Sequence, residues 1–276
     1  MSYKSMGDAV VNEFFAPLLA NLLLASLLWL FATWRRDVSL IDLVWPLFFV
    51  VAAWIWFSPD AQSSALQWCV LLLVMAWGGR LHIHLASRNL GHGEDRRYQQ
   101  IRANNSPGFW WKSYFLVFVL QAVLAWIASW TIFGALRGVG QSTIPSPQWA
   151  LLSVAGGLLA FGGLLFESIA DWQLSKFKSL QQNNGQVLDS DLWSLCRHPN
   201  YFGECCFWWG IYLVALPNAW WSIVSPLLMT VLLLKVSGVT LLEQDIHERR
   251  PAYRDYIQRT PAFIPRVSKW LRRADP

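Results

Sequence analysis

The chain has little charge. Only 14% of its 276 residues are Asp, Glu, Lys or Arg, well below the roughly 25% that is usual in soluble domains. Its four Cys residues show neither paired nor metal-type spacing, which argues against a disulfide framework and a zinc site. No GxGxxG motif follows a predicted strand, so a Rossmann dinucleotide site is excluded. We also expect no nucleic-acid partner.

Long apolar runs take the place of charge. Most have the roughly 17–25 residues that a helix needs to cross a bilayer, and the 19 Trp cluster near their ends, as interfacial aromatic residues do. We predict an all-α integral membrane protein, one domain over residues 1–276, with about seven transmembrane helices. The first run is interpreted as a retained span, because no convincing cleavage site follows it. The seven runs cover residues 13–34, 43–59, 64–86, 109–134, 148–172, 201–216 and 219–242.

Basic residues fall on alternate connections between these runs. If the N-terminus lies outside, the outer segments hold only Lys4 and Arg137, and most of the other Lys and Arg residues lie in the inner segments or at the inner ends of the runs. The positive-inside rule therefore predicts an outside N-terminus and a cytoplasmic C-terminus. We expect residues 243–276 to form an amphipathic cytoplasmic tail.

Acidic residues gather on the same predicted side. Ionisable groups at membrane depth are costly and usually face a bundle interior or a water-filled cavity. We therefore expect a polar pocket that opens to the cytoplasm. The acidic residues on this side are Asp42, Glu94, Asp95, Glu167, Asp171, Asp189, Asp191, Glu204, Glu243, Asp245 and Glu248.

Two stretches near the second and third runs are candidates for that pocket. Asp42, in RDVSLIDLVW, is either a charge favoured by a helix N-terminus or a buried functional acid. In GGRLHIHLASRNLGHGEDRRY, Arg80, His84 and Arg88 repeat every four residues and share a helix face, while His82 points elsewhere. The basic residues here either fix the topology or line the pocket.

A third stretch, FESIADWQLSKFK, ends the fifth run. Glu167 and Asp171 share a helix face, and Lys178 continues that face one heptad beyond Asp171. Because Glu167 lies in the last turns of an apolar span, a purely solvated role does not account for it.

A fourth stretch, LCRHPNYFGECCFWWG, opens the sixth run. Pro199 suits the first turn of a helix and keeps His198 extended. Asn200 and Glu204 share a face, with Arg197 three residues before Asn200. These side chains converge at a helix N-terminus, where free N–H groups favour anions.

The tail stretch EQDIHERRPAYRDYIQRTPAFIP leaves the last run. Spacings of four, three and four place Glu243, His247, Arg250 and Arg254 on one helix face. This face is either a lid over a cofactor, with Tyr256 beside it and an Arg directed at a phosphate, or an interfacial helix that binds anionic lipid.

These motifs together resemble one superfamily. RHPNYFGE, the tail stretch, RNLGHGEDRRY and DWQLSKFK are similar to elements of steroid 5-alpha-reductases, sterol C14 reductases and isoprenylcysteine methyltransferases. The similarity covers about residues 35–266 and is strongest to a bacterial branch next to the 5-alpha-reductases. It implies a bacterial inner-membrane location.

The resemblance implies NADPH as cofactor and assigns contacts residue by residue. In the reductases the Asn and Glu of the Asn-Tyr-Phe-Gly-Glu element contact NADPH. Arg suits its phosphates best. The predicted cofactor-binding residues are Arg88, Arg96, Arg97, Glu167, Asp171, Lys178, Arg197, His198, Asn200, Tyr201, Glu204, Glu243, His247, Arg250, Arg254 and Tyr256.

The substrate implied is a hydrophobic enone, steroid-like or another lipid, that enters from the bilayer. The 5-alpha-reductases polarise its carbonyl with a Glu of the second span and a Tyr of the third, a pair without a certain counterpart here. Asp42 is the nearest acid and His82 falls roughly where the Tyr stands, so both are predicted catalytic residues. A carboxyl group in an apolar site can stay protonated and donate.

Two other functions stay open. A methyltransferase would use the RHPNY pocket for S-adenosylmethionine, which has no phosphates and needs fewer Arg. A transporter or a non-enzymatic lipid-binding protein is the other class, and the absence of an internal repeat or a broken helix pair argues against it.

Overall fold

A computed structural model describes residues 3–57, 64–137, 147–236, 239, 243 and 251–266, except for the side chains of residues 3–10. All regular structure in these residues is helical, with no strand among them. The all-α prediction is thus confirmed for this part of the chain.

Four helical stretches are long and apolar enough to cross a membrane: Val11–Arg35, Ala65–Asn89, Phe109–Arg137 and Pro147–Ser179. Leu40–Trp56 and Trp220–Val236 are apolar but shorter, and Pro199–Ala215 has 17 residues. Each of the seven predicted runs overlaps one of these stretches. The membrane assignment therefore stands, whereas the count of seven spans and the orientation remain predictions.

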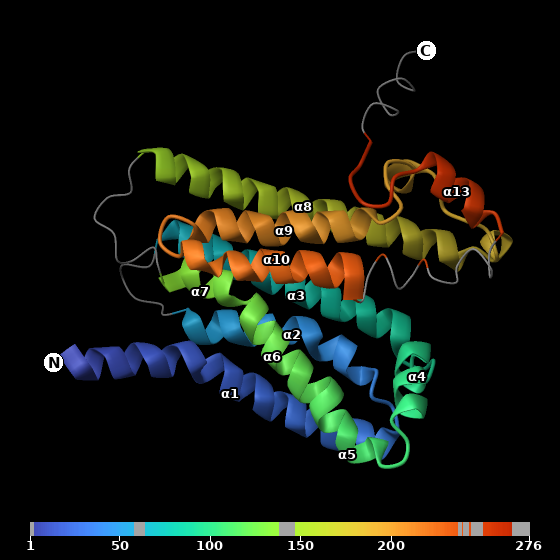
Figure 1. The fold of residues 1–276 in the computed structure, drawn as a ribbon. Helices are drawn as coiled ribbons and strands as arrows, with labels where there is room; N and C mark the ends of the chain where they lie inside the picture. The colour runs from blue at the N-terminus through green and yellow to red at the C-terminus, as the bar shows by residue number, and fades with distance from the viewer. Residues whose placement is uncertain are drawn as a thin grey trace. The chain divides into compact units, whose positions relative to one another are not determined.

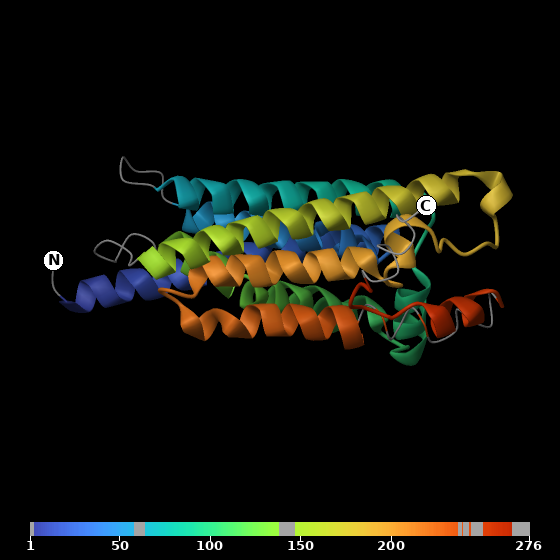
Figure 2. The same ribbon diagram turned by 90° about the horizontal axis from the view of Figure 1, so that it is seen from above.

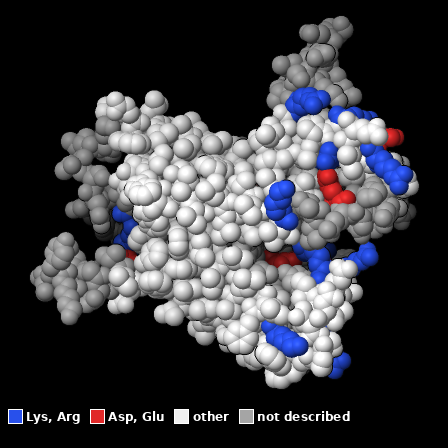
Figure 3. Space-filling view, viewed as in Figure 1, with Lys and Arg blue, Asp and Glu red and all other residues white. Residues whose placement is uncertain are grey.

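The sides of the helices are almost uncharged on the face drawn in Figure 3. Leu19, Leu23, Leu151 and Leu158 are each more than half exposed, as they would be against lipid. Most Lys, Arg, Asp and Glu on this face lie near one end of the helices (Figure 3).

The chain divides into two compact units, residues 1–146 with 215–225 and residues 147–214 with 226–276. We call them unit 1 and unit 2 and describe each by itself. Figures 1 and 2 show their helices in two views.

Unit 1 contains seven α-helices in its described part. They are α1 (Tyr3–Arg35), α2 (Leu40–Trp56), α3 (Ala65–Asn89), α4 (Arg96–Asn104), α5 (Phe109–Ser113), α6 (Leu120–Ala128) and α7 (Trp130–Arg137), with a π-helical turn, η1 (Tyr114–Val119), between α5 and α6. Helix α1 packs against α2 and α6, and α2 packs against α3. The ring of Phe14 lies within 6.4 Å of the rings of Phe15, Trp56, Trp126, Trp130, Phe133 and Trp221.

Unit 2 is built on α8 (Pro147–Ser179) and α9 (Pro199–Ala215), which lie side by side in both views (Figures 1 and 2). A Cβ atom at Gly203 would lie 2.7 Å from the Gly163 carbonyl oxygen, and one at Gly210 would lie 2.6 Å from that of Gly156. Only glycine permits so close an approach of two backbones. We call this line of contacts the α8–α9 seam.

The other helices in the described ranges of unit 2 with given bounds are short. They are the 3-10 turns η3 (Gln181–Asn183) and η4 (Asp191–Ser194), the end of α10 (Val224–Val231), the π-helical turn η6 (Leu232–Val236) and α13 (Tyr253–Arg259). The 3-10 turn η5 (Trp220–Ile223) and the start of α10 belong to unit 1.

The C-terminal segment, residues 251–266, is tied to the segment that precedes α9. The Tyr256 hydroxyl donates to the Trp193 carbonyl oxygen at 2.5 Å. The Arg197 and Arg266 backbone N–H groups bond to the Pro261 and Leu195 carbonyl oxygens. This segment is therefore anchored within unit 2.

The predicted single helix face from Glu243 to Arg254 is wrong. Residues 251 and 252 form a turn, and α13 begins only at Tyr253. Pro251 explains the break, because proline lacks an N–H group and keeps the residue before it out of helical geometry.

Candidate functional site

The cytoplasm-facing end predicted for the α8–α9 seam carries a polar pair. The Asn200 side chain donates from Nδ2 to Asp171 Oδ1 at 3.1 Å. Asp171 is 5% exposed, and the close approach of Gly163 and Gly203 sets the spacing of the two helices that carry the pair. Asn200 Oδ1 is buried and accepts no hydrogen bond from the described residues.

That oxygen is the feature that fits a ligand. A buried amide oxygen without a donor costs free energy, so such atoms usually meet a water or a bound group. Asp171 can only accept when ionised, so its bond to Asn200 assigns the amide nitrogen to that side and leaves Oδ1 for another donor. The amide N–H of a nicotinamide ring is a donor of this kind.

Two predicted acidic contacts lie beside this pair. Glu167 is 2% exposed and Glu204 is 7% exposed. A Cβ atom at Gly203 would lie 2.6 Å from the Glu167 backbone nitrogen, so Glu167 belongs to the α8–α9 seam. We call Glu167, Asp171, Asn200 and Glu204 the seam site.

Arg197 and His198 make a different cluster, which we call the Glu243 clamp. Arg197 binds Glu243 through Nε and Nη2 at 2.7 and 2.8 Å. His198 Nε2 lies 2.8 Å from Glu243 Oε1. The Nη1 atom of Arg197 donates to the Thr260 and Ile257 carbonyl oxygens. Four donated bonds use most of the five N–H groups of this guanidinium.

The clamp keeps its carboxylate ionised. Burial alone would raise the pKa of Glu243, but the hydrogen bonds and charges of His198 and Arg197 outweigh it and lower the pKa to about 2. Burial and the nearby Glu243 carboxylate raise the pKa of Tyr253, whose hydroxyl lies 3.4 Å from Glu243 Oε1. The structure thus gives Arg197 and Glu243 a role in holding the C-terminal segment.

The remaining predicted contacts of unit 2 are spread out. The Tyr201 ring is stacked on the His198 ring, with centroids 5.6 Å apart. Lys178 is exposed in the last turn of α8, and Arg254 is exposed on α13. Tyr256 is 1% exposed and serves as an anchor. The predicted contacts His247 and Arg250 lie outside the described residues.

In unit 1 the structure brings Asp42 together with α4. Asp42 accepts from Arg97 Nη2 at 2.9 Å and from the Tyr98 hydroxyl at 2.5 Å. Gln121 donates to the Tyr98 oxygen at 2.9 Å, and Arg97 also binds Asp95. Asp42 therefore serves as an acceptor in this network.

Asp95 also begins α4. Its side chain accepts from the Arg97 backbone N–H at 2.9 Å, an N-cap bond. Burial alone would raise the pKa of Asp95, but the bonds from Arg97 outweigh it and hold that pKa below its usual value. The predicted contact Arg88 is exposed and donates to the Asn89 side chain, and Arg96 is exposed in the first turn of α4.

His82 has a defined tautomer when neutral. Its Nδ1 atom lies 2.7 Å from the Leu43 carbonyl oxygen. A carbonyl oxygen only accepts, so Nδ1 carries the proton and Nε2 is an acceptor unless the ring is protonated.

Sequence reasoning missed Tyr98 as a partner of Asp42 and Gln121 as the residue that donates to Tyr98. Tyr98 ends the quoted stretch GEDRRY, and Gln121 is a polar residue inside the apolar run 109–134. An amide at membrane depth was the available signal, because it needs a partner there.

The comparison with protein families gives one match. The model of a family described as "Protein of unknown function (DUF1295)" matches residues 28–260, which is most of the chain. The comparisons with curated proteins and with solved structures returned no match. The chain therefore belongs to the DUF1295 family.

Proposed function

We propose that this member of the DUF1295 family is a membrane reductase that uses NADPH to reduce a carbon–carbon double bond conjugated to a carbonyl. The substrate is a hydrophobic molecule, steroid-like or another lipid, that reaches the protein from the bilayer. The proposal combines the resemblance of RHPNYFGE and the other stretches to the 5-alpha-reductase superfamily with the geometry of the seam site.

One observation carries the proposal. Asn200 stands in that motif, and its buried Oδ1 atom lacks a donor among the described residues, while its Nδ2 atom is committed to Asp171. In the proposal, Asn200 Oδ1 accepts a hydrogen bond from the carboxamide N–H of the nicotinamide. Asp171 holds the Asn200 side-chain amide in the orientation that this bond requires. Glu204 and Glu167 are acceptors for ribose hydroxyl groups.

When bound, NADPH supplies the hydride. The residues of this chain supply the rest. The Gly contacts of the α8–α9 seam fix the distance between Asp171 and Asn200. The Glu243 clamp fixes the segment that leads into α9, through Arg197. A site held by rigid helices and buried hydrogen bonds loses little entropy on binding, and this favours a defined hydride-transfer geometry.

The predicted catalytic acids take revised roles in the proposal. Because Asp42 accepts from both Arg97 and Tyr98, we propose it as a positioning residue that orients those two donors. His82 can donate from Nε2 only as imidazolium, since Nδ1 faces the Leu43 carbonyl oxygen.

A methyltransferase is the second candidate, and one observation favours it. The seam site holds three carboxyl groups, Glu167, Asp171 and Glu204, while Arg197 is already used by the Glu243 clamp. An acid-rich site suits a sulfonium cation, whereas NADPH phosphates need cations. Exposed Lys178 and Arg254 are the basic residues of unit 2 that we assign to those phosphates.

The two candidates separate in one experiment. Purified protein in detergent is heated with NADPH, NADH or S-adenosylmethionine, and the melting temperature is measured. The reductase proposal expects stabilisation by NADPH, because ligands that bind only the folded state raise its stability. Stabilisation by S-adenosylmethionine and none by NADPH would replace the reductase with the methyltransferase.

A further inference from the structure

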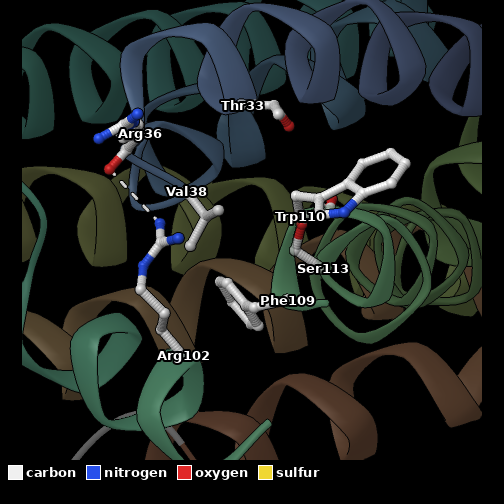
Figure 4. Close-up of a pocket in the computed structure, with 7 residues that line it drawn as sticks. All are labelled: Thr33, Arg36, Val38, Arg102, Phe109, Trp110 and Ser113. Atoms are coloured by element: carbon white, nitrogen blue, oxygen red, sulfur yellow. Dashed lines mark hydrogen bonds between the residues drawn. The ribbon is translucent and has the colours of Figure 1, made fainter. Parts of the chain in front are cut away.

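A pocket of about 240 Å³ lies in unit 1, and none of its lining residues is among the site residues assigned above. Figure 4 shows it at the end of α1, next to the start of α5. Its lining residues are Thr33, Arg36, Val38, Arg102, Phe109, Trp110 and Ser113. The volume is below the roughly 300–1,000 Å³ typical of sites for drug-sized ligands, so it suits a head group better than a dinucleotide.

The polar lining is rich in donors. Arg102 binds Glu94 through Nε and Nη2 at 2.9 and 2.7 Å, so this pair does not use the Nη1 edge of the guanidinium. Arg102 is held in place by the Phe109 ring, whose centroid lies 4.7 Å from Cζ, and its Nη2 also lies 3.4 Å from the Arg36 carbonyl oxygen (Figure 4). The Arg102 guanidinium is therefore held in one position, and the pair with Glu94 leaves its Nη1 edge for a ligand.

Thr33 adds an unsatisfied hydroxyl. Its Oγ1 atom is buried and has no hydrogen-bond partner among the described residues. A helical Thr usually bonds back to a carbonyl oxygen of the preceding turn. An oxygen that does not do so is available to a ligand as a donor.

The backbone at the pocket is strained. Arg36 has a φ of 54°, in the left-handed region. Glycine is the usual residue where a helix ends in this geometry, because a side chain is strained there. An Arg with an exposed side chain at such a position indicates that its charge has a use, since strain of this kind is found mainly at functional sites.

The pocket lies at the ends of two candidate membrane spans, Val11–Arg35 and Phe109–Arg137. Trp34 and Trp110 beside it are 74% and 60% exposed, as aromatic residues at the level of lipid head groups are. A phosphate with acyl chains attached would place its charge near Arg36 and Arg102 and its chains along the exposed apolar sides of the helices.

We propose that this pocket binds the phosphate head group of an anionic glycerophospholipid. The inference does not depend on the proposed reductase activity, because none of the lining residues belongs to the seam site or the Glu243 clamp. The same chemistry would accept a soluble phosphate ester, and the test distinguishes the two sources.

The test uses the full-length protein in detergent, with lipid retention counted by native mass spectrometry. Phosphatidylglycerol should bind more tightly than phosphatidylcholine. Arg36→Gln should weaken phosphatidylglycerol binding by about tenfold, the effect of losing one hydrogen bond to a charged group. The matched control is Arg35→Gln, which removes an adjacent exposed charge that does not line the pocket and should change the affinity by less than about twofold.

Two further variants separate a loss of lipid binding from a loss of folding. Thr33→Val keeps the shape of the side chain and should weaken binding by removing the hydroxyl. Arg36→Gly should lose lipid affinity and yet raise the melting temperature, because glycine relieves the positive φ. NADPH binding should be unchanged in all of these variants.

Four results would overturn the inference. Equal losses in Arg35→Gln and Arg36→Gln would mean diffuse attraction to charge. Equal affinity for phosphatidylcholine would remove the anionic requirement. Full displacement of lipid by soluble glycerol 3-phosphate would assign the pocket to a metabolite. Loss of NADPH binding in Arg36→Gln would assign it to the cofactor.

Discussion

Two arginine–glutamate pairs, one in each unit, have the same chemistry and different surroundings. In unit 2, Arg197 grips both oxygens of Glu243 and donates to two backbone carbonyls, and its side chain is 9% exposed. In unit 1, Arg102 grips both oxygens of Glu94, but its side chain is 37% exposed and lines a pocket. The pair alone therefore does not define a role.

In both arginines Nε and Nη2 bind the carboxylate, and the difference lies in the surroundings of Nη1. An Arg such as Arg197, most of whose N–H groups bond to the protein, is a structural link, and a neighbouring carboxylate compensates its charge. An Arg with one edge directed at a pocket can also serve a ligand. Arg197 was expected to bind the cofactor from its position beside Asn200, and the structure uses it to hold the C-terminal segment.

Removing Arg197 has the largest expected effect, and the same change at Arg102 is its comparison. Arg197→Ala should lower the free energy of unfolding by about 3 kcal/mol or more, because it removes the donor to Glu243 Oε2 and the donor to the Thr260 carbonyl oxygen in a largely buried site. Arg102→Ala should cost about 1 kcal/mol, the value for a partly exposed pair. Denaturant unfolding in detergent measures both.

Equal losses in the two variants would contradict this comparison. An Arg197→Lys variant serves as control, because it keeps the charge and loses the two-point geometry. It should fall between the wild type and Arg197→Ala.

Next in size is the α8–α9 seam, which places the polar end of unit 2. Gly203→Ala should destabilise the protein by about 1–3 kcal/mol, because the new methyl group meets backbone of α8 at 2.6 and 2.7 Å. Gly162→Ala is the control, since nothing lies within 4 Å of its Cβ position. It should stabilise by up to about 1 kcal/mol through helix propensity. Similar melting temperatures in the two variants would contradict the role of the Gly contacts in holding α8 against α9.

Acid should weaken the Glu243 clamp by a smaller amount. The pKa of Glu243 is lowered to about 2 in the folded protein from an ordinary value of 4.5. Its contribution is therefore complete above about pH 4.5 and is lost as pH falls towards about 2. Because the group is partly exposed, solvent screening reduces the effect to about 1 kcal/mol.

The matched variant for this window is Glu243→Gln, whose side chain does not titrate. Its stability should fall less than that of the wild type between pH 4.5 and pH 2.5 in thermal unfolding. Parallel curves for the two proteins would show that other carboxylates dominate acid unfolding.

The sequence predicted much of this architecture. Apolar run length gave the helices, and the helical spacing of Glu167 with Asp171 and of Asn200 with Glu204 gave two shared faces that the structure contains. The pairing of Asn200 with Asp171 could not be predicted from spacing within one helix, because it depends on how closely α8 and α9 approach.

The error in the tail has a physical cause. Glu243 and Arg254 were placed on one helix face by counting residues, and the turn at residues 251 and 252 breaks that count. The catalytic role of Asp42, which rests on its place as the acid nearest to the family's Glu, stays a prediction. Its acceptor role comes from Arg97 and Tyr98, which reach it from a separate helix. Partners from distant segments decide the role of a charged group.

The central claim is that Asn200 offers its free amide oxygen to a nicotinamide. NADPH affinity is measured by fluorescence titration for the wild type, Asn200→Ala and Asn183→Ala. Asn183 is the control, because its side chain donates to the Phe177 carbonyl oxygen at 2.9 Å elsewhere in unit 2. The account predicts about tenfold weaker NADPH binding in Asn200→Ala, a loss of roughly 1.4 kcal/mol, and unchanged binding in Asn183→Ala. Unchanged NADPH affinity in a folded Asn200→Ala protein would contradict it.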